Sequence, residues 1–174
     1  MPLAIASCGK EDDTSQPLPV EPVELITTIH LLITDSATLV TDTVTFKDID
    51  GPGGNAPLWD SLFLEPNRVY NMEIVLLDES QTPSDSISNE VLAEGDTHLF
   101  IFQPSPATGF IQVAVTDVDD NNQPLGLHSR LVSGNASSGN FRVSLRHYLS
   151  AADKAQGTNG YETDIDVTFG SLIQ

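Results

Sequence analysis

The sequence predicts an all-β protein, namely an antiparallel Ig-like β-sandwich of about seven to nine strands. Apolar and polar residues alternate in seven separate runs, which is typical of strands with one face in a core and the other in water. The runs are short, and segments rich in Gly, Asn, Asp and Pro separate them. Only residues 88–93 and 151–156 suit a helical turn, which argues against a parallel α/β sheet.

Each expected strand follows from β-branched and aromatic residues at alternate positions. The seven runs cover residues 26–33, 38–47, 70–76, 98–102, 111–116, 141–147 and 165–169. In the last run, the alternation places Ile165, Val167 and Phe169 on the core face. The same alternation places Asp164 and Asp166 on the solvent face.

Composition and charge restrict the function. The chain has 174 residues, and 39% of them are hydrophobic. This hydrophobic fraction is too high for a fully disordered protein. The formal net charge is −18, which argues against nucleic acid as a partner. Lys and Arg are absent between Arg68 and Arg130, a stretch with ten Asp or Glu, so a divalent cation or a neutral ligand is favoured there.

The N-terminal segment predicts a lipid anchor. Residues 5–8 read Ile-Ala-Ser-Cys, which fits a bacterial lipobox, and Cys8 is the one cysteine of the chain. We therefore expect residues 1–8 to be a signal remnant ending in a lipidated Cys8, and residues 9–23, acidic and Pro-rich, to be a tether. Residues 24–174 would then form the sandwich, held at the outer membrane by the lipid. The alternative is a free thiol in a frayed tail.

Several stretches resemble a family of small Bacteroidetes outer-membrane lipoproteins. They cover residues 25–29, 48–57, 64–70, 86–98, 145–147 and 160–169, and the closing run Glu-Thr-Asp-Ile-Asp-Val-Thr-Phe is the most specific of them. Members are labelled type 1 periplasmic binding fold superfamily protein. The resemblance implies a lipoprotein at the outer membrane with a shared β fold, and it implies no activity.

Two histidines are candidate metal ligands. His98 shares a strand face with Phe100 and Phe102, and His147 ends another apolar face. If their strands are neighbours, the two imidazoles and a nearby carboxylate, that of Glu90, Glu94 or Asp96, would form a mixed site for Zn²⁺ or a similar ion. The alternative is a pair of core-edge histidines that hydrogen-bond to the backbone or to a carboxylate.

A second candidate metal site follows the 111–116 run. Asp117, Asp119 and Asn121 have the alternate oxygen spacing of a calcium loop. Asn122 stands where an EF-hand has Gly, and His128 stands where it has a bidentate Glu, so the loop is no EF-hand. The alternative is a solvated turn held by side-chain hydrogen bonds.

Trp59 is a candidate platform for a ligand, and its alternative is a packed core residue. The sequence lacks a nucleophile elbow, an HExxH motif and a Walker loop, so we expect no catalysis.

The expected function is therefore non-catalytic binding. The protein would be a lipid-anchored accessory at the outer membrane that captures a ligand or docks an outer-membrane transporter, such as a TonB-dependent one, or another surface protein. One alternative is a lipoprotein that binds a divalent metal ion (Zn, Cu or Ca). Another is a structural or adhesive module whose sheet edges mediate assembly.

Overall fold

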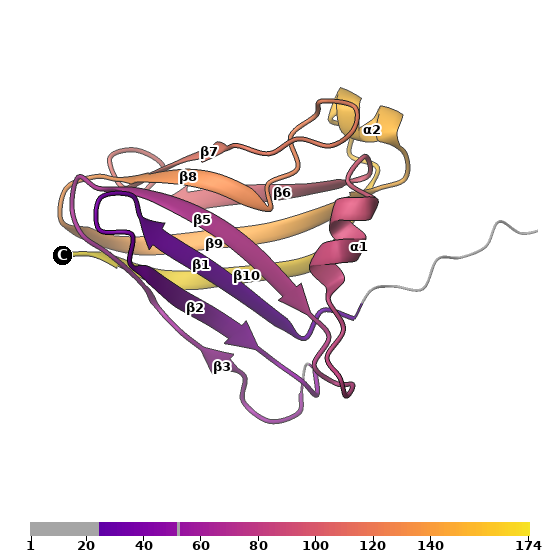
Figure 1. Ribbon diagram of the computed structural model, residues 1–174, viewed down its shortest axis with the longest axis horizontal. Helices are drawn as coiled ribbons and strands as arrows, with labels where there is room; N and C mark the ends of the chain where they lie inside the picture. Colours follow the sequence, from indigo (N-terminus) through magenta and orange to yellow (C-terminus); the bar gives the residue numbers. More distant parts are fainter. Residues whose placement is uncertain (1–24, 52) are drawn as a thin grey trace, which may run out of the picture.

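A computed structural model describes residues 25–51 and 53–174 of the chain (Figure 1). Cys8, the predicted signal remnant and the predicted tether lie outside the described residues. Among the residues described, no helix is long and apolar enough to cross a bilayer.

Within residues 25–51 and 53–174, ten strands form two sheets. The first sheet has the order β3-β2-β1-β5-β8-β7, and the second has the order β4-β10-β9-β6. The first contains β1 (Thr28–Asp35), β2 (Thr41–Lys47), β3 (Leu58–Trp59), β5 (Val69–Leu77), β7 (Ile111–Val115) and β8 (His128–Ser133). The second contains β4 (Leu62–Leu64), β6 (His98–Ser105), β9 (Ser137–Tyr148) and β10 (Tyr161–Ile173). Neighbours pair antiparallel, except that β4 runs parallel to β10.

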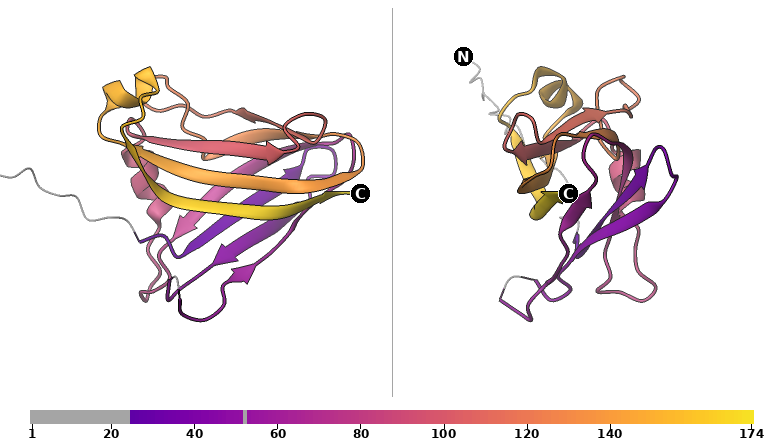
Figure 2. Two further views of the ribbon diagram at one scale, coloured as in Figure 1. Left: turned by 180° about the vertical axis from the view of Figure 1, so that it is seen from behind. Right: turned by 90° about the vertical axis from the view of Figure 1, so that its left-hand side faces the viewer.

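The sheets lie face to face and enclose one core. Figure 2 shows the four-stranded sheet, with β9 and β10 in orange and yellow, across the first sheet. Buried apolar residues alternate along the strands of both sheets, as Ile29, Leu31 and Ile33 do in β1 and Phe141, Val143 and Leu145 do in β9. Alternation buries apolar surface on one side of each strand, and burial of each such side chain contributes roughly 1.5–3 kcal/mol.

Two short helices close one end of the sandwich (Figure 1). Helix α1 (Ile87–Ala93) buries Ile87 and Val91 and packs on β5. Helix α2 (Ala151–Gln156) begins after Ser150, whose hydroxyl accepts a hydrogen bond from the Asp153 N–H at 3.2 Å. It ends at Gly157, whose φ of 61° is a left-handed conformation that favours glycine.

The all-β sandwich expected from the sequence is confirmed. Each of the seven expected runs overlaps a strand, although residues 26–27, 38–40 and 116 lie outside β1, β2 and β7. Both expected helical turns are present, as α1 and α2. The sequence pattern did not indicate β3, β4 and β8. Of these, β3 and β4 have only two and three residues, so they are too short to show a periodicity.

Candidate functional site

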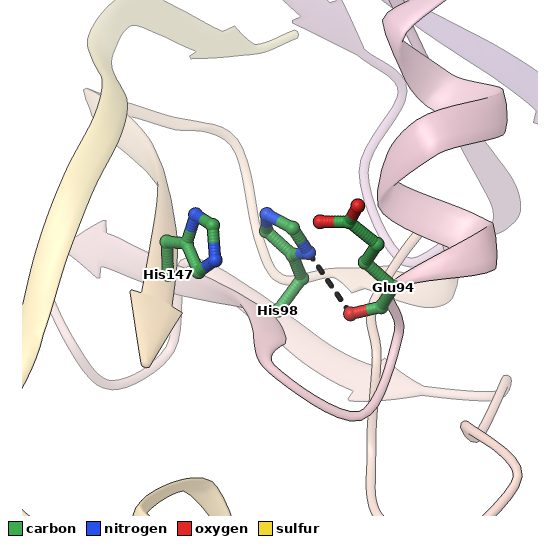
Figure 3. A group of neighbouring side chains, drawn as sticks. All are labelled: Glu94, His98 and His147. Carbon is green, nitrogen blue, oxygen red and sulfur yellow. Dashed lines mark hydrogen bonds between the residues drawn. The ribbon is translucent and has the colours of Figure 1, made fainter. Parts of the chain in front are cut away.

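The two candidate histidines face each other across adjacent strands of the second sheet. His98 opens β6 and is the direct partner of His147 on β9. Their ring centroids are 4.3 Å apart and the rings are tilted by 40° (Figure 3). The pairing of β6 with β9 therefore brings together two ligands that the sequence placed on separate strands.

Hydrogen bonding determines the tautomer of His98. Its Nδ1 lies 3.0 Å from the backbone oxygen of Glu94, at the end of α1 (Figure 3). A carbonyl oxygen only accepts, so Nδ1 carries the proton and Nε2 presents a lone pair. Metal-binding histidines are commonly oriented by this kind of hydrogen bond from the other ring nitrogen.

His98 is neutral at physiological pH. The side chain has no exposed surface, and burial lowers its pKa to about 4. The hydrogen bond to Glu94 opposes this shift, whereas His147 and Lys154 add to it. A neutral imidazole is the form that binds a metal ion, so His98 is poised to act as a ligand without first losing a proton.

A β-bulge in β10 turns the carboxylate of Asp164 toward His98. Thr163 pairs with Arg146 and Ile165 pairs with Leu145, so Asp164 is an extra residue that has no partner on β9. Bulges re-aim side chains and occur often beside functional sites. The Asp164 side chain is only 8% exposed, so the prediction that it lies on the solvent face is wrong.

The Asp164 carboxylate and the His98 imidazole face each other without forming a hydrogen bond. The Asp164 Oδ2 lies 3.7 Å from the His98 Nε2, which is longer than a hydrogen bond. Both atoms are buried, and neither has a hydrogen-bond partner among the described residues. Burial raises the pKa of Asp164, an effect that His147 opposes and Glu162 reinforces.

Glu94 supplies a second carboxylate from the solvent side. The side chains of Glu94, His98 and His147 each offer one ligand atom, and these atoms lie within 4.8 Å of one another (Figure 3). Glu94 is exposed, His147 is partly buried and His98 is buried. The cluster therefore extends from the core to the surface, which leaves a route for an ion to enter.

In the loop after β7, Asp119 uses both of its carboxylate oxygens in protein contacts, whereas Asp117 uses only its Oδ1 and its buried Oδ2 has no partner among the described residues. The Asp119 Oδ1 accepts hydrogen bonds from the backbone N–H groups of Asn121 and Gln123 at 2.8 and 2.9 Å. Its Oδ2 accepts from the buried Lys154 Nζ at 2.7 Å. The Asp117 Oδ1 accepts from the Gly126 N–H at 2.9 Å. These contacts form a turn held by side-chain hydrogen bonds, and calcium binding there stays a prediction from spacing alone.

Trp59 lies at the edge of the first sheet, away from the histidines. It is 51% exposed, and its ring meets Phe46 edge-on at 5.0 Å between centroids. The half-exposed ring is compatible with a ligand platform. The ligand atoms that cluster are those of Glu94, His98 and His147, and Asp164 adjoins this cluster at the His98 Nε2, 3.7 Å from its Oδ2.

The sequence offered no sign of Asp164 as a site residue. It stands two positions from Asp166, which points outward and pairs with Arg142. In the alternating pattern, both Asp164 and Asp166 look like solvent-face carboxylates. Only the bulge distinguishes the buried Asp164 from the exposed Asp166.

No family model, no curated protein and no solved structure matches this chain. The resemblance to outer-membrane lipoproteins therefore stays a prediction from the sequence. What defines the site is its geometry: an all-β sandwich carries two histidines and two carboxylates at one end of its second sheet.

Proposed function

We propose that this chain is a non-catalytic, lipid-anchored outer-membrane protein that binds a divalent transition-metal ion through His98, His147 and Asp164. The observation that carries the proposal is the pair of buried, unpartnered atoms, His98 Nε2 and Asp164 Oδ2, that face each other at 3.7 Å. Buried polar atoms without partners are costly and call for an explanation.

The spacing of the two atoms suits a metal ion better than a hydrogen bond. Zinc binds nitrogen and oxygen ligands at about 2.0–2.2 Å, so neighbouring ligands of a tetrahedral ion are roughly 3.3–3.6 Å apart. The observed 3.7 Å lies close to this value. A cation placed between the two atoms would satisfy both and would neutralise the buried Asp164.

The chemistry of the ligands indicates which ions would bind. Imidazole nitrogen suits Zn²⁺ and Cu²⁺, whereas Ca²⁺ takes oxygen ligands almost exclusively. Glu94 would contribute twice: its backbone oxygen orients His98, and its exposed carboxylate is a candidate fourth ligand. The lipid anchor on Cys8 belongs to the proposal on the strength of the lipobox.

Zinc binding is the direct test. After treatment with a chelator, we expect native mass spectrometry to detect one added zinc ion per chain. Free zinc at 100 times the dissociation constant stabilises a folded protein by about 2.7 kcal/mol. For a chain of this size that corresponds to a rise in Tm of roughly 5–10 °C. Ca²⁺ should give no comparable rise.

The matched variants are Asp164→Asn and Asp166→Asn, which remove one carboxylate charge each from the same strand. Asp166 pairs with Arg142 on the surface, so its variant should keep the zinc response. Asp164→Asn should lose most of it. A wild-type Tm that stays unchanged at saturating Zn²⁺ and Cu²⁺ would refute the proposal, as would an equal response from both variants.

In the metal-free protein, Asp164→Asn should stabilise the fold, although the same change should remove the stabilisation that zinc provides. At pH 8 we expect this variant to raise the free energy of unfolding by roughly 1–3 kcal/mol, because it removes a buried charge without a close partner. The new amide would also donate to the His98 Nε2. Urea denaturation in the presence of EDTA measures this, and Asp166→Asn should give no increase. A loss of stability in Asp164→Asn would show that the carboxylate is structural.

A further inference from the structure

We propose that a groove between β2 and β4 receives an extended, Lys- or Arg-bearing segment of a partner protein, which adds to the first sheet as a strand beside β2. This inference is independent of the metal site, since the groove lies where β2, the turn before it and β4 meet. Two adjoining hollows, of about 530 and 380 Å³, share the lining residues Ile33, Asp42 and Phe63. We call them together the β2–β4 groove.

The edge of β2 is open along the groove. Strand β3 covers β2 only at Phe46 and Lys47, and the next outward backbone groups, those of Thr45, bond to Asp60. Outward and inward groups alternate in an antiparallel strand, so the N–H and C=O of Thr43 and Thr41 also point away from β1. Among the described residues no strand pairs with them there.

Such an edge is a template for strand addition. An extended peptide that pairs with an open edge gains backbone hydrogen bonds, and its alternate side chains enter pockets on one face. Here that face is apolar at Ile33, Val44 and Phe63, and the Phe63 ring is 58% exposed. The groove therefore offers both the backbone groups and the apolar contacts that an added strand uses.

The charge of the groove identifies the occupant. Four carboxylates line the two hollows, those of Asp35, Asp42, Asp60 and Glu65, and no Lys or Arg is among the lining residues. Backbone N–H groups of Ala37 and Thr38 donate to Asp35 and hold its pKa below the usual range, so it is charged at neutral pH.

Neighbouring groups do not cancel this charge. Arg68 lies beside the groove, where it pairs with Glu65 at 2.7 Å and lies 3.7 Å from Asp35, so one cation faces four carboxylates. A second copy of this chain, with a net charge of −18, would bring more acidic groups to the same edge. A basic segment of a different protein is the complementary occupant.

A synthetic ten-residue peptide of alternating Lys and Val tests the proposal, with a Glu–Val peptide as the charge control and EDTA present throughout. We expect fluorescence anisotropy to show binding of the Lys–Val peptide only, weakened by high salt. Thr43→Pro, which removes an outward N–H, should weaken binding at least tenfold, whereas Thr43→Val should not.

The charge variants separate the groove from the general acidity of the protein. Asp42→Lys changes the charge of the groove, and Glu90→Lys makes the same change on α1, at the other end of the sandwich (Figure 1). Only Asp42→Lys should weaken binding tenfold or more. Equal binding by these two variants, or no binding by the wild type at millimolar peptide, would overturn the proposal. A dimer of the wild type that Thr43→Pro dissociates would overturn it in favour of a second copy.

Discussion

Replacing Lys154 with Met is expected to lower the free energy of unfolding by roughly 3–5 kcal/mol, the usual cost of removing one partner from a buried ion pair. The Lys154 side chain is 2% exposed and that of Asp119 is 1% exposed. The Lys154 Nζ donates to the Asp119 Oδ2 at 2.7 Å and to the Gly95 oxygen at 2.6 Å. Without the ammonium group, the Asp119 carboxylate would be buried with its charge uncompensated.

The pair connects three segments around the histidine cluster. Lys154 comes from α2, Asp119 from the loop after β7, and Gly95 from the turn between Glu94 and His98. Burial opposes ionisation of Asp119, but hydrogen bonds from Lys154, Gln123 and Asn121 outweigh it and hold its pKa below the usual range. The pair therefore holds the turn that positions His98.

A double-mutant cycle in urea measures the coupling. The double variant Lys154→Met/Asp119→Asn should recover most of the loss, because the Asn oxygen keeps the backbone hydrogen bonds and carries no charge. A Lys154→Met variant within 1 kcal/mol of the wild type would contradict a structural role for the pair. Such a result would also remove the link proposed between α2 and the histidine cluster.

The second large effect concerns acid stability of the metal-free protein. The pKa of His98 is about 4 in the folded protein and 6.5 as a free side chain. Between these values the unfolded chain binds a proton that the folded protein does not, so stability is complete above pH 6.5 and falls as the pH drops toward 4. The contribution of His98 to this loss is about 3 kcal/mol.

His98→Asn is the variant that isolates this contribution. Its side-chain amide retains a donor for the Glu94 oxygen and does not titrate in this range. Urea denaturation in EDTA should show a wild-type stability that falls more steeply than that of the variant from pH 6.5 to 4. The raised pKa of Asp164 has the opposite effect, because the free energy of unfolding falls as the pH rises toward that pKa. This effect is common to the wild type and the variant, so the comparison isolates His98. Parallel profiles would show that His98 is not held neutral by burial.

Much of the fold was predictable because the alternation of apolar and polar residues within a single strand shows which of its faces is buried. Most of the 26–33 run lies in β1 and the 141–147 run lies within β9. In the 165–169 run, Ile165, Val167 and Phe169 face the core as expected. Strand β8 was missed because His128–Ser133 holds only two adjacent apolar residues among polar ones. The spacing of Asp117, Asp119 and Asn121 fits either an ion loop or a turn, and only the structure shows that Asp119 accepts the hydrogen bonds of a turn.

The candidate site was predictable only in part. The sequence identified His98 and His147 as the ends of two apolar faces, and the pairing of β6 with β9 made them neighbours. Asp164 was assigned to the solvent, because alternation cannot reveal a one-residue bulge. The open edge of β2 also had no signal, since it depends on how little of the strand β3 covers.

By itself, the sequence determined the all-β class, the two short helices and which residues alternate between core and solvent. The tertiary structure alone decided that two histidines and a buried carboxylate share one space, that Lys154 is buried on Asp119, and that the edge of β2 is left open. The physical reason is the distance along the chain between the residues that interact. Periodicity follows from the burial of one strand face, whereas strand pairing, register shifts and ion pairs depend on contacts between segments far apart in the chain.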